Sequence, residues 1–371
     1  MLSFSYLLEL AHGKAWTNIH SYLKSKQNEV CRLHYGLNAF YQEKYYESLI
    51  QYPTAQTVSG NPQLYHPTLF TCPSSGLFYL RNAKIFHKGY VQSPEGQFFS
   101  DLTYTTRDQG RLDKIRLKSI LNTGTTKQLE GWYANITYPL STHYYHWIVE
   151  SLPRLHFISD YIQSLQGIFI PKGLLPVMRE PLYYFGFQEK QLIELEESLS
   201  YEVEHLLIPN YCSGLNVPYW VKSFFRSNSF SEYRYQQSIA SKKIYISRSD
   251  ASCRRMINEK DIIPLLESAG FQVLSLTGKS FSEYIQLFSS ASTIVGIHGA
   301  GLTHIVFSNP GVKILEIQPH ASFPPHVYHS LASIVGGQYF YINGEQENRC
   351  NKNGDFYLNS KLLKNFLDLI D

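Results

Sequence analysis

The sequence of 371 residues lacks several features that would assign it to a common class of protein. Its five cysteines are odd in number and form no CxxC pair, so neither a disulfide framework nor a zinc site is indicated. Nowhere do 18 uncharged apolar residues occur together, and no basic segment precedes the N-terminal apolar run. We therefore expect no spanning helix and no signal peptide. A reducing, cytoplasmic location is favoured, and peripheral association with the inner face of the membrane stays open.

An excess of charge of one sign is also missing. The 33 basic and 30 acidic residues give a formal net charge of +3, so bulk charge supports neither nucleic-acid binding nor coating of a membrane. An anionic ligand must therefore be met by a local group of cations. Aromatic residues make up 15% of the chain, which suits contact with planar bases or sugar faces. A tyrosine-rich core and surface would explain the same composition.

The most informative stretch covers residues 293–317. A β-branched run at 293–297 predicts a buried parallel strand, and the sequence HGAG follows it directly. One or two helical turns are expected at 302–307, and a second buried strand at 312–317. Since the crevice of an open α/β sheet lies at the carboxyl ends of its strands, we expect His298, the glycine turn and Glu316 to face one cleft.

The remaining chain reads as two α/β domains, because alternating strand and helix signals occur on both sides of a turn-rich connection at 209–218. We expect an N-terminal domain over 1–210, to which the resemblance described below assigns the acceptor side, with a lead-in of two or three helices at 1–60 and mainly strands and loops at 64–140. A helix interrupted at a proline is expected from 141 onward. The second domain, at 219–345, is predicted to be Rossmann-like, and the resemblance described below makes it the nucleotide-sugar-binding domain. The segment 346–371 is predicted to be a tail and helix, with packing back on the first domain as an option.

An arginine-rich segment follows the first strand of the second predicted domain, at 243–247. Arg248 comes directly after this strand, and Arg254 and Arg255 follow one loop later. Guanidinium groups at strand ends can clamp phosphate oxygens with two hydrogen bonds each. The alternative is a solvated basic loop with no ligand.

The glycine turn suits a nucleotide more than a dinucleotide. A GxGxxG fingerprint would need a third glycine where His304 stands, although Glu316 ends the next strand, where a ribose-binding acid is expected. Backbone N–H groups at the turn could hold the diphosphate of a mononucleotide, helped by an imidazole. Tight packing and a capping histidine are the alternative. The candidate residues for binding a nucleotide diphosphate here are His298, Gly299, Ala300, Gly301, Leu302, Thr303, His304 and Glu316.

A third group of polar residues lies on the interrupted helix. His146 and Glu150 are spaced i,i+4 and therefore share one face, with His143 close by. Converging ligands could bind a metal, but the sequence contains no Asp-x-Asp pair, and acid–base use of His146 or Glu150 is preferred. A buried polar pair beside Trp147 is the alternative.

Three separated motifs together resemble glycosyltransferase family 61. They are YHWIVESLPR at 145–154, ISR with RRMINE at 246–259, and HGAGLTH at 298–304. This family holds bacterial capsular-polysaccharide enzymes, plant xylosyl- and arabinosyltransferases and animal O-linked N-acetylglucosaminyltransferases. The likeness covers roughly residues 130–320 and favours the bacterial capsular type.

The resemblance implies a GT-B fold, with two Rossmann-like domains facing a cleft. It also implies inverting transfer of a sugar from a nucleoside-diphosphate donor, with UDP favoured, to a hydroxyl of a glycan or lipid-linked glycan in capsule or cell-surface polysaccharide synthesis. No cofactor and no obligatory metal are expected. Two alternatives stay open: a non-catalytic nucleotide- or glycan-binding protein of this fold, and an NAD-dependent oxidoreductase, which His304 disfavours.

The resemblance also distributes roles among the candidate residues. The arginine motif falls on Arg248 and on Arg254 or Arg255 as diphosphate ligands, and the glycine turn falls on 299–301. His146 and Glu150 fall on the acceptor side, and the resemblance does not decide which of them is the base. Because a carboxylate suits a base for a sugar hydroxyl, we expect Glu150 to be the base and His146 its partner facing the cleft.

Overall fold

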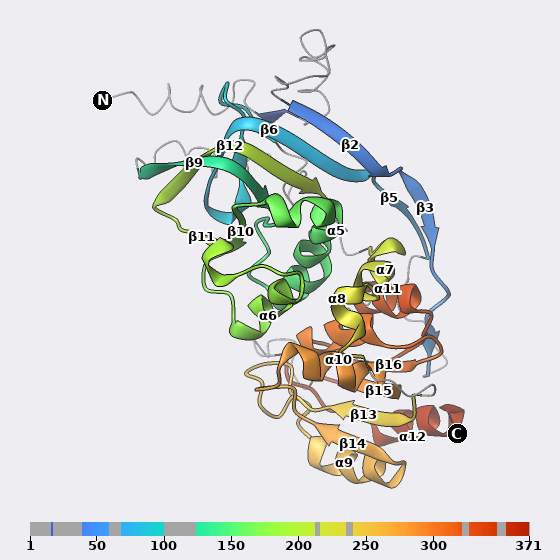
Figure 1. The fold of residues 1–371 in the computed structure, drawn as a ribbon. Coiled ribbons are helices and arrows are strands. Elements are labelled where there is room, and N and C mark those ends of the chain that lie inside the picture. Colours follow the sequence, from blue (N-terminus) through green and yellow to red (C-terminus); the bar gives the residue numbers. More distant parts are fainter. Residues whose placement is uncertain are drawn as a thin grey trace, which may run out of the picture. The chain divides into compact units, whose positions relative to one another are not determined.

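A computed structural model describes residues 16–17, 39–58, 68–99, 124–211, 216–234, 240–320, 326–346 and 354–370. The chain divides into two compact units, each with its own sheet (Figure 1). The first unit comprises Met1–Ser48 and Pro73–Gly214, and the second comprises Leu49–Cys72 and Leu215–Asp371. The segment Leu49–Cys72 thus joins the C-terminal unit, although the sequence placed it within an N-terminal domain.

The first unit contains a mixed sheet. Its order is β1 (Trp16–Thr17), β8 (Phe98–Phe99), β7 (Val91–Gln92), β6 (Ser75–Ile85), β12 (Leu199–Asn210), β9 (Thr125–Asn135), β10 (Gly167–Pro171) and β11 (Leu192–Leu195). Strand β2 (Ala39–Tyr45) also pairs with β6, antiparallel to it. The strands from β12 to β11 run parallel, whereas β6 pairs antiparallel with β12. Strands and loops were predicted for the described parts of 64–140, and this prediction is confirmed.

One helical run follows β9 and changes its geometry along its length. It consists of α4 (Tyr144–His146), the π-helical turn η3 (Trp147–Ser151), the 3-10 turn η4 (Leu152–Arg154), α5 (Leu155–Ile158) and the 3-10 segment η5 (Ser159–Ser164). Pro153 has no N–H for an α-helical bond, so the helix widens before it and tightens at it. The predicted interruption at the proline is confirmed. Short 3-10 turns also occur at η1 (His87–Gly89) and η6 (Glu189–Gln191).

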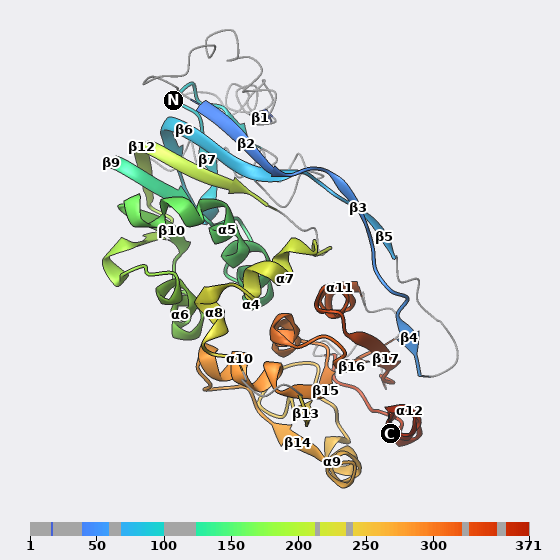
Figure 2. The ribbon, with the colours of Figure 1, turned by 45° about the vertical axis from the view of Figure 1, so that its right-hand side comes forward.

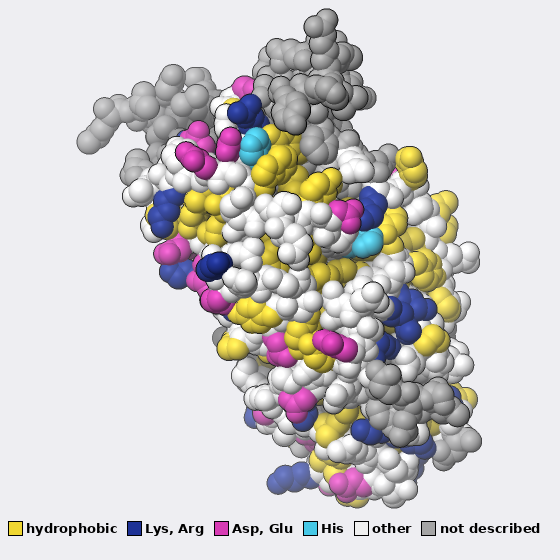
Figure 3. All heavy atoms as spheres, viewed as in Figure 1, with side chains coloured by type: hydrophobic (Ala, Val, Ile, Leu, Met, Phe, Trp, Pro, Cys, Tyr) yellow, Lys and Arg dark blue, Asp and Glu magenta, His cyan; other side chains and the backbone are white. Residues whose placement is uncertain are grey.

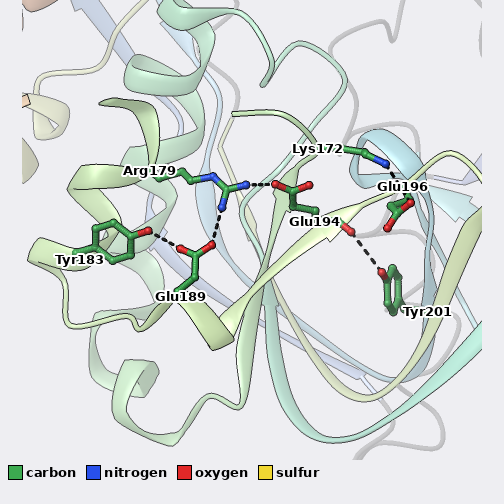
Figure 4. Close-up of polar contacts among 7 residues, drawn as sticks. All are labelled: Lys172, Arg179, Tyr183, Glu189, Glu194, Glu196 and Tyr201. Atoms are coloured by element: carbon green, nitrogen blue, oxygen red, sulfur yellow. Dashed lines mark hydrogen bonds and ion pairs between the residues drawn. The ribbon is translucent and has the colours of Figure 1, made fainter. Parts of the chain in front are cut away.

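Ion pairs fasten helix α6 (Pro176–Tyr184) to strand β11 (Figure 4). The guanidinium of Arg179 donates to Glu189 at 2.7 Å and also to Glu194, while the hydroxyl of Tyr183 donates to the other oxygen of Glu189 at 2.5 Å. A single arginine that satisfies two carboxylates holds the helix against the edge strand. We interpret this group as a structural brace.

The second unit is a doubly wound parallel sheet. Its order is β14 (Phe271–Leu274), β13 (Lys242–Ile246), β15 (Ala291–Ile297), β16 (Lys313–Gln318), β17 (Gln338–Asn343) and β4 (Gln56–Thr57). Its helical segments are α7 (Trp220–Phe225), α8 (Asn228–Ser231), α9 (Glu259–Ser268), α10 (Phe281–Ser289), η7 (Ala300–Phe307), α11 (His326–Val335) and α12 (Ser360–Ile370). Strands β3 (Ser48–Gln51) and β5 (Leu69–Cys72) form a separate two-stranded ribbon (Figure 2).

The local predictions for the second unit are confirmed. Strand, turn, helical turns and strand follow one another from β15 through η7 to β16, and α10 begins with the expected capping box between Ser280 and Glu283. The helical stretch expected at 219–240 consists of the two short helices α7 and α8 in its described part. The predicted parallel, doubly wound order is therefore correct for this unit.

One prediction about the start of the chain is wrong. Residues 39–57, which we expected to be helical, form strands β2 to β4, because pairing with β6 and β17 satisfies their backbones. The rest of the predicted helical lead-in lies outside the described residues, apart from β1. The helix expected at the end of the chain is present as α12 and packs within its own unit: Leu363 and Phe366 lie in the core of that unit, and Lys313 donates to the carbonyl of Ile370 at 2.8 Å.

The described surface is mixed in charge. On the face shown in Figure 3, basic and acidic side chains are interspersed, as the balanced composition implies. Among the described residues, no helix has both the length and the apolar character needed to cross a membrane.

Candidate functional site

The second sheet has a topological switch point between β13 and β15. The chain leaves β13 for β14 on one side and then returns to β15 on the other side. In doubly wound sheets, ligands bind at the carboxyl ends of the two strands that flank such a point. Arg248 lies just beyond the end of β13, and His298 and Gly299 lie just beyond the end of β15. The sheet order therefore brings together two motifs that lie 50 residues apart in the sequence.

The guanidinium of Arg248 lies directly against Gly299. A Cβ atom on Gly299 would be 2.1 Å from Nη1 of Arg248, so this close approach requires glycine. Nη2 of Arg248 donates to the carbonyl of Cys253 at 3.0 Å, while the buried Nε has no hydrogen-bond partner among the described residues. Burial lowers the pKa of this guanidinium, and the nearby Arg254 lowers it further. A partly buried cation with an unmatched donor suits an anionic ligand.

Arg254 and Arg255, the two arginines that follow, have different partners in the structure. Arg255 is paired with Asp355: its Nη2 lies 2.9 Å from Oδ2, and its backbone N–H donates to Oδ1 at 2.8 Å. This pair fastens the C-terminal segment to the loop after β13. Arg254 has a left-handed backbone, with φ of 55°, and its charge acts on Arg248. Arg254 therefore stays a candidate diphosphate ligand, whereas Arg255 has a structural partner in Asp355.

His298 belongs to a buried hydrogen-bonded chain. Its Nδ1 contacts Oε1 of Glu316, and the hydroxyl of Tyr339 donates to Oε2 of the same carboxylate at 2.5 Å. Glu316 is completely buried, whereas the side chain of His298 is 11% exposed. Burial and Glu316 hold the pKa of Tyr339 well above its usual value, so its hydroxyl stays a donor. Glu316 was expected to bind ribose, but here it is an enclosed partner of His298.

The remaining residues of the HGAGLTH motif divide between surface and core. Ala300 is exposed and Gly301 half-buried, whereas Leu302 and Thr303 are fully buried in η7. His304 was expected to be a donor ligand, and this is corrected. Its ring packs 4.0 Å from that of Tyr284, its Nδ1 lies 3.0 Å from the carbonyl of Gly301, and burial lowers its pKa to about 4.

The first unit has its own switch point between β9 and β12. The parallel part of its sheet runs from β9 to β10 and β11, and the chain then returns to β12 on the other side of β9. Arg154 joins the two strand ends, because its guanidinium donates to the carbonyl of Thr137 at 3.3 Å and to that of Tyr211 at 2.7 Å. The same side chain donates to the carbonyl of Glu150 at 3.3 Å, which ties the helical run to this edge.

His146 and Glu150 are in direct contact at this second switch point. Nδ1 of His146 lies 2.6 Å from Oε2 of Glu150, and the hydroxyl of Tyr138 donates to the same oxygen. The carboxylate is completely buried, and the imidazole is 17% exposed. Burial lowers the pKa of His146 to about 4, with a smaller contribution from His143, so the ring is neutral at pH 7. The expected i,i+4 pairing is present, but the member that meets solvent is His146.

The metal alternative for this helix finds no geometric support. Within the described ranges, no group of three or more His, Cys, Asp and Glu side chains converges so that it could hold a metal ion. The ring centres of His143 and His146 are 6.2 Å apart and nearly perpendicular. The geometry of this group instead suits proton transfer between His146 and a bound hydroxyl.

Sequence reasoning missed several residues that complete these sites. Tyr138 and Arg154 hold the first group, while Tyr339 and Tyr328, whose ring centre lies 5.0 Å from that of His298, surround the second. Arg154 follows Glu150 at an i,i+4 spacing, which is a usable signal. The tyrosines carry no such signal, because their partners come from other elements of the fold.

The fold and these groups define an α/β protein with two switch-point sites, one of them lined by arginine and a glycine turn. Residues 144–315 match the family model described as Glycosyltransferase 61. The matched segment contains His146, Glu150, Arg248 and the HGAGLTH motif, so the chain is similar to glycosyltransferase family 61 over the residues that carry both candidate sites.

Curated relatives with the same printed name extend this result. The chain is similar to "Protein O-linked-mannose beta-1,4-N-acetylglucosaminyltransferase 2" of Takifugu rubripes, at 36% identity over 109 residues, which cover 27% of this chain and 18% of the relative. The Xenopus laevis protein of that name is 32% identical over 104 residues, covering 26% and 18%. For the Mus musculus protein the values are 34% over 96 residues, covering 24% and 16%. The matches thus span less than a fifth of each relative's length.

Proposed function

We propose that this protein is an inverting glycosyltransferase that moves a sugar from a nucleoside-diphosphate donor to a hydroxyl of a glycan or lipid-linked glycan. The observation that carries the proposal is the contact of Arg248 with Gly299 at the switch point of the second unit. A partly buried cation against a glycine turn is suited to a diphosphate. The match to glycosyltransferase family 61 over the same residues supports this reading.

In this proposal, the second unit holds the donor. Arg248 and Arg254 would contact the diphosphate, and the backbone N–H groups of 299–301, at the start of η7, would add donors. These cations would stabilise the charge that develops on the departing nucleoside diphosphate, so we propose that no metal is required. A GT-B arrangement of the two units would bring the acceptor to this site.

We assign the base to His146, which reverses the expectation from sequence. The acceptor oxygen forms a bond to the anomeric carbon as the bond from that carbon to the phosphate oxygen breaks, and the bonding electrons leave with the diphosphate. The acceptor proton passes to Nε2 of His146, while Nδ1–H donates to Glu150. The carboxylate of Glu150 is completely buried, so it has no exposed atom to meet the acceptor. Its role would be to fix the tautomer of the His146 ring, and Tyr138 would hold the carboxylate in place. A single in-line displacement of this kind inverts the anomeric centre.

The sugar and the acceptor are open to test. The printed names of the relatives make N-acetylglucosamine the first sugar to try, and O-linked mannose is the acceptor in those names. The resemblance to capsular enzymes makes a cell-surface polysaccharide the other acceptor class, with UDP as the favoured nucleotide. For that acceptor we propose a cytoplasmic protein that works at the inner face of the membrane.

A donor screen tests the proposal. Thermal shift across UDP-, GDP- and CMP-sugars should identify one nucleotide, and that donor should be hydrolysed slowly without acceptor, because an active transferase leaks some sugar to water. The matched control is Arg248→Ala, which should lose both the shift and the hydrolysis. Binding with no turnover in any acceptor mixture would instead indicate a non-catalytic nucleotide-binding protein. A shift with NAD alone would contradict the proposal.

A further inference from the structure

The buried chain Tyr339–Glu316–His298 is built from three separate elements of the second unit. Glu316 is in β16, Tyr339 is in the neighbouring β17, and His298 lies just beyond the end of β15. Ile314 pairs with Tyr339 in the sheet register, so Glu316 and Tyr339 lie on one face and their side chains meet diagonally. The register of three parallel strands thus sets the position of the carboxylate.

This carboxylate occupies a costly position. Glu316 has no exposed surface, and removal of a carboxylate from water costs several kcal/mol unless hydrogen bonds and charge compensate it. Two donors meet it, the imidazole at Oε1 and the phenol at Oε2. An apolar residue of similar size would pack on this face without that cost. The arrangement therefore points to a carboxylate that positions the ring of His298, which is more exposed than Glu316.

The Tyr339–Glu316–His298 group has the same three residue types as the Tyr138–Glu150–His146 group of the first unit, but its surroundings differ. The charge of Arg254 lowers the pKa of Arg248. Both cations also act to lower the pKa of Tyr328, which lies beside His298 and whose pKa burial raises. The groups around the His298–Glu316 pair are Tyr339 from β17, Tyr328 from α11, and Arg248 and Arg254 from the loop after β13, while His329 of α11 packs against Tyr339. An anion bound to these cations would lie next to a paired imidazole.

We infer that the His298–Glu316 pair takes up a proton when a diphosphate binds and presents Nε2–H of His298 to the leaving phosphate, with Glu316 and Tyr339 as positioning residues. One proton is then shared between Nδ1 and Oε1, and Nε2 carries the other. When the donor bond breaks, the departing phosphate oxygen accepts the Nε2 hydrogen bond and can take that proton. The pair regains a proton from solvent when the next donor binds.

The inference rests on the proposed function, because it assigns the anion at this site to the donor diphosphate. It divides proton handling between the two units: His146 receives the proton of the acceptor, and His298 supplies one to the leaving group. It also replaces the expected ribose-binding role of Glu316 with a role exerted through His298.

The test measures binding of inorganic pyrophosphate to the full chain by calorimetry, in buffers of different ionisation enthalpy, from pH 6 to pH 8.5. The wild type should take up more protons on binding than His298→Asn, by up to one per site. The slope of log Kd against pH should fall by about one in that variant, because one linked proton changes affinity tenfold per pH unit. At pH 6.5 the variant should bind about tenfold more weakly.

Further variants separate positioning from folding. Glu316→Gln should reduce proton uptake like His298→Asn, and Tyr339→Phe, which removes one hydroxyl, should reduce it in part. Two control variants should keep the proton uptake of the wild type. They are Tyr341→Phe, two residues from Tyr339 on the same strand, and His329→Gln, at the other histidine near Tyr339. If Glu316→Gln does not fold, Tyr339→Phe and His298→Asn still decide the question.

Each result bears on the inference and on the proposed function differently. Equal proton uptake in wild type and His298→Asn would overturn the inference, while donor turnover could still support the transferase. Uptake that depends on His298, with no turnover of any sugar nucleotide, would keep the anion site and contradict the transferase. Failure of the wild type to bind pyrophosphate would overturn both.

Discussion

The two units each position a buried glutamate beside a histidine, and they do so in different ways. Each holds a fully buried glutamate between a tyrosine hydroxyl and the Nδ1 of a histidine, at the switch point of its own sheet. In the first unit the glutamate follows its histidine by one helical turn, at residues 146 and 150. In the second unit the partners lie 18 residues apart and meet through strand register. A local spacing can be read from the sequence, whereas a register cannot.

The two groups also differ in the charges around them. In the first group, the guanidinium of Arg154 donates to the backbone carbonyls of Thr137, Glu150 and Tyr211. The second group has Arg248 and Arg254 as neighbours. We therefore expect the first histidine to accept a proton and the second to donate one. The following predictions test that contrast, from the largest expected effect to the smallest.

Replacement of the first histidine should have the largest effect. His146→Gln removes the proposed base, so turnover should fall by about 10²–10⁴-fold while donor affinity stays unchanged, because the residue lies in the first unit and we assign the donor to the second. Steady-state kinetics with calorimetry of donor binding measures both quantities.

Two neighbours serve as comparisons for that variant. Glu150→Gln keeps the shape but removes the charge that orients the ring, and its turnover should fall by about 10–10²-fold. His143→Gln, three residues before His146, should remain nearly as active as the wild type. If Glu150→Gln were as inactive as expected for a lost base and His146→Gln were active, the carboxylate would be the base and the two roles would be reversed.

Arg248→Ala should weaken donor binding with little loss of stability. Each charge-assisted hydrogen bond is worth roughly 1.5–3 kcal/mol, so the affinity should fall by about tenfold or more. Arg255→Ala is the matched control, since Arg255 is paired with Asp355, and it should keep donor affinity. Calorimetry for affinity and chemical denaturation for stability distinguish the two variants. Unchanged donor affinity in Arg248→Ala would remove this arginine from the site.

His304 should affect stability rather than the site. Its pKa is about 4 in the folded protein, because burial disfavours the charged ring, against about 6.5 in an unfolded chain. Below pH 6.5 the unfolded state therefore binds more protons, and the free energy of unfolding should fall as the pH is lowered toward 4, by on the order of 1 kcal/mol per pH unit from this group.

The variant His304→Phe tests this assignment. The ring would keep its contacts with Tyr284 and Phe288, and denaturation at pH 7, 6 and 5 should show a shallower loss of stability than the wild type. Donor affinity should be retained. A loss of donor affinity with stability intact would return His304 to the binding site.

Chelation should have the smallest effect. If arginines and the glycine turn carry the diphosphate charge, activity in excess EDTA should equal that without it. Initial rates before and after treatment provide the measurement. Loss of activity that Mn²⁺ or Mg²⁺ restores would contradict the metal-free proposal and would direct attention back to His143, His146 and Glu150.

Much of the second unit was predictable because its signals are local. The β-branched run of β15, the glycine turn after it and the capping box of α10 each lie within a few residues, and the structure confirms all three. The prediction for 39–57 failed because β2 to β4 are fixed by strands far along the chain, and spaced aromatic residues fit a strand as well as a helix.

The sequence predicted which residues gather at the two candidate sites, and the structure adds which of them are buried and which partners they have. The pairing of His146 with Glu150 follows from helical spacing, but sequence does not show that the carboxylate is enclosed and the imidazole is the exposed member. Arg254 and Arg255 are adjacent, and only the ion pair with Asp355, 100 residues away, separates them. His304 fits a ligand motif in sequence and packs between rings in the fold.

The sequence by itself determined the strand and helix order of the C-terminal unit, the motifs at its strand ends and the family match. These depend on periodicity, glycine and spacing, which act within short segments of chain. Only the tertiary structure decided which side chains are buried and which partners they have. Burial sets the pKa of His146, and strand register joins Glu316 to His298, because both depend on contacts between elements that are distant in sequence.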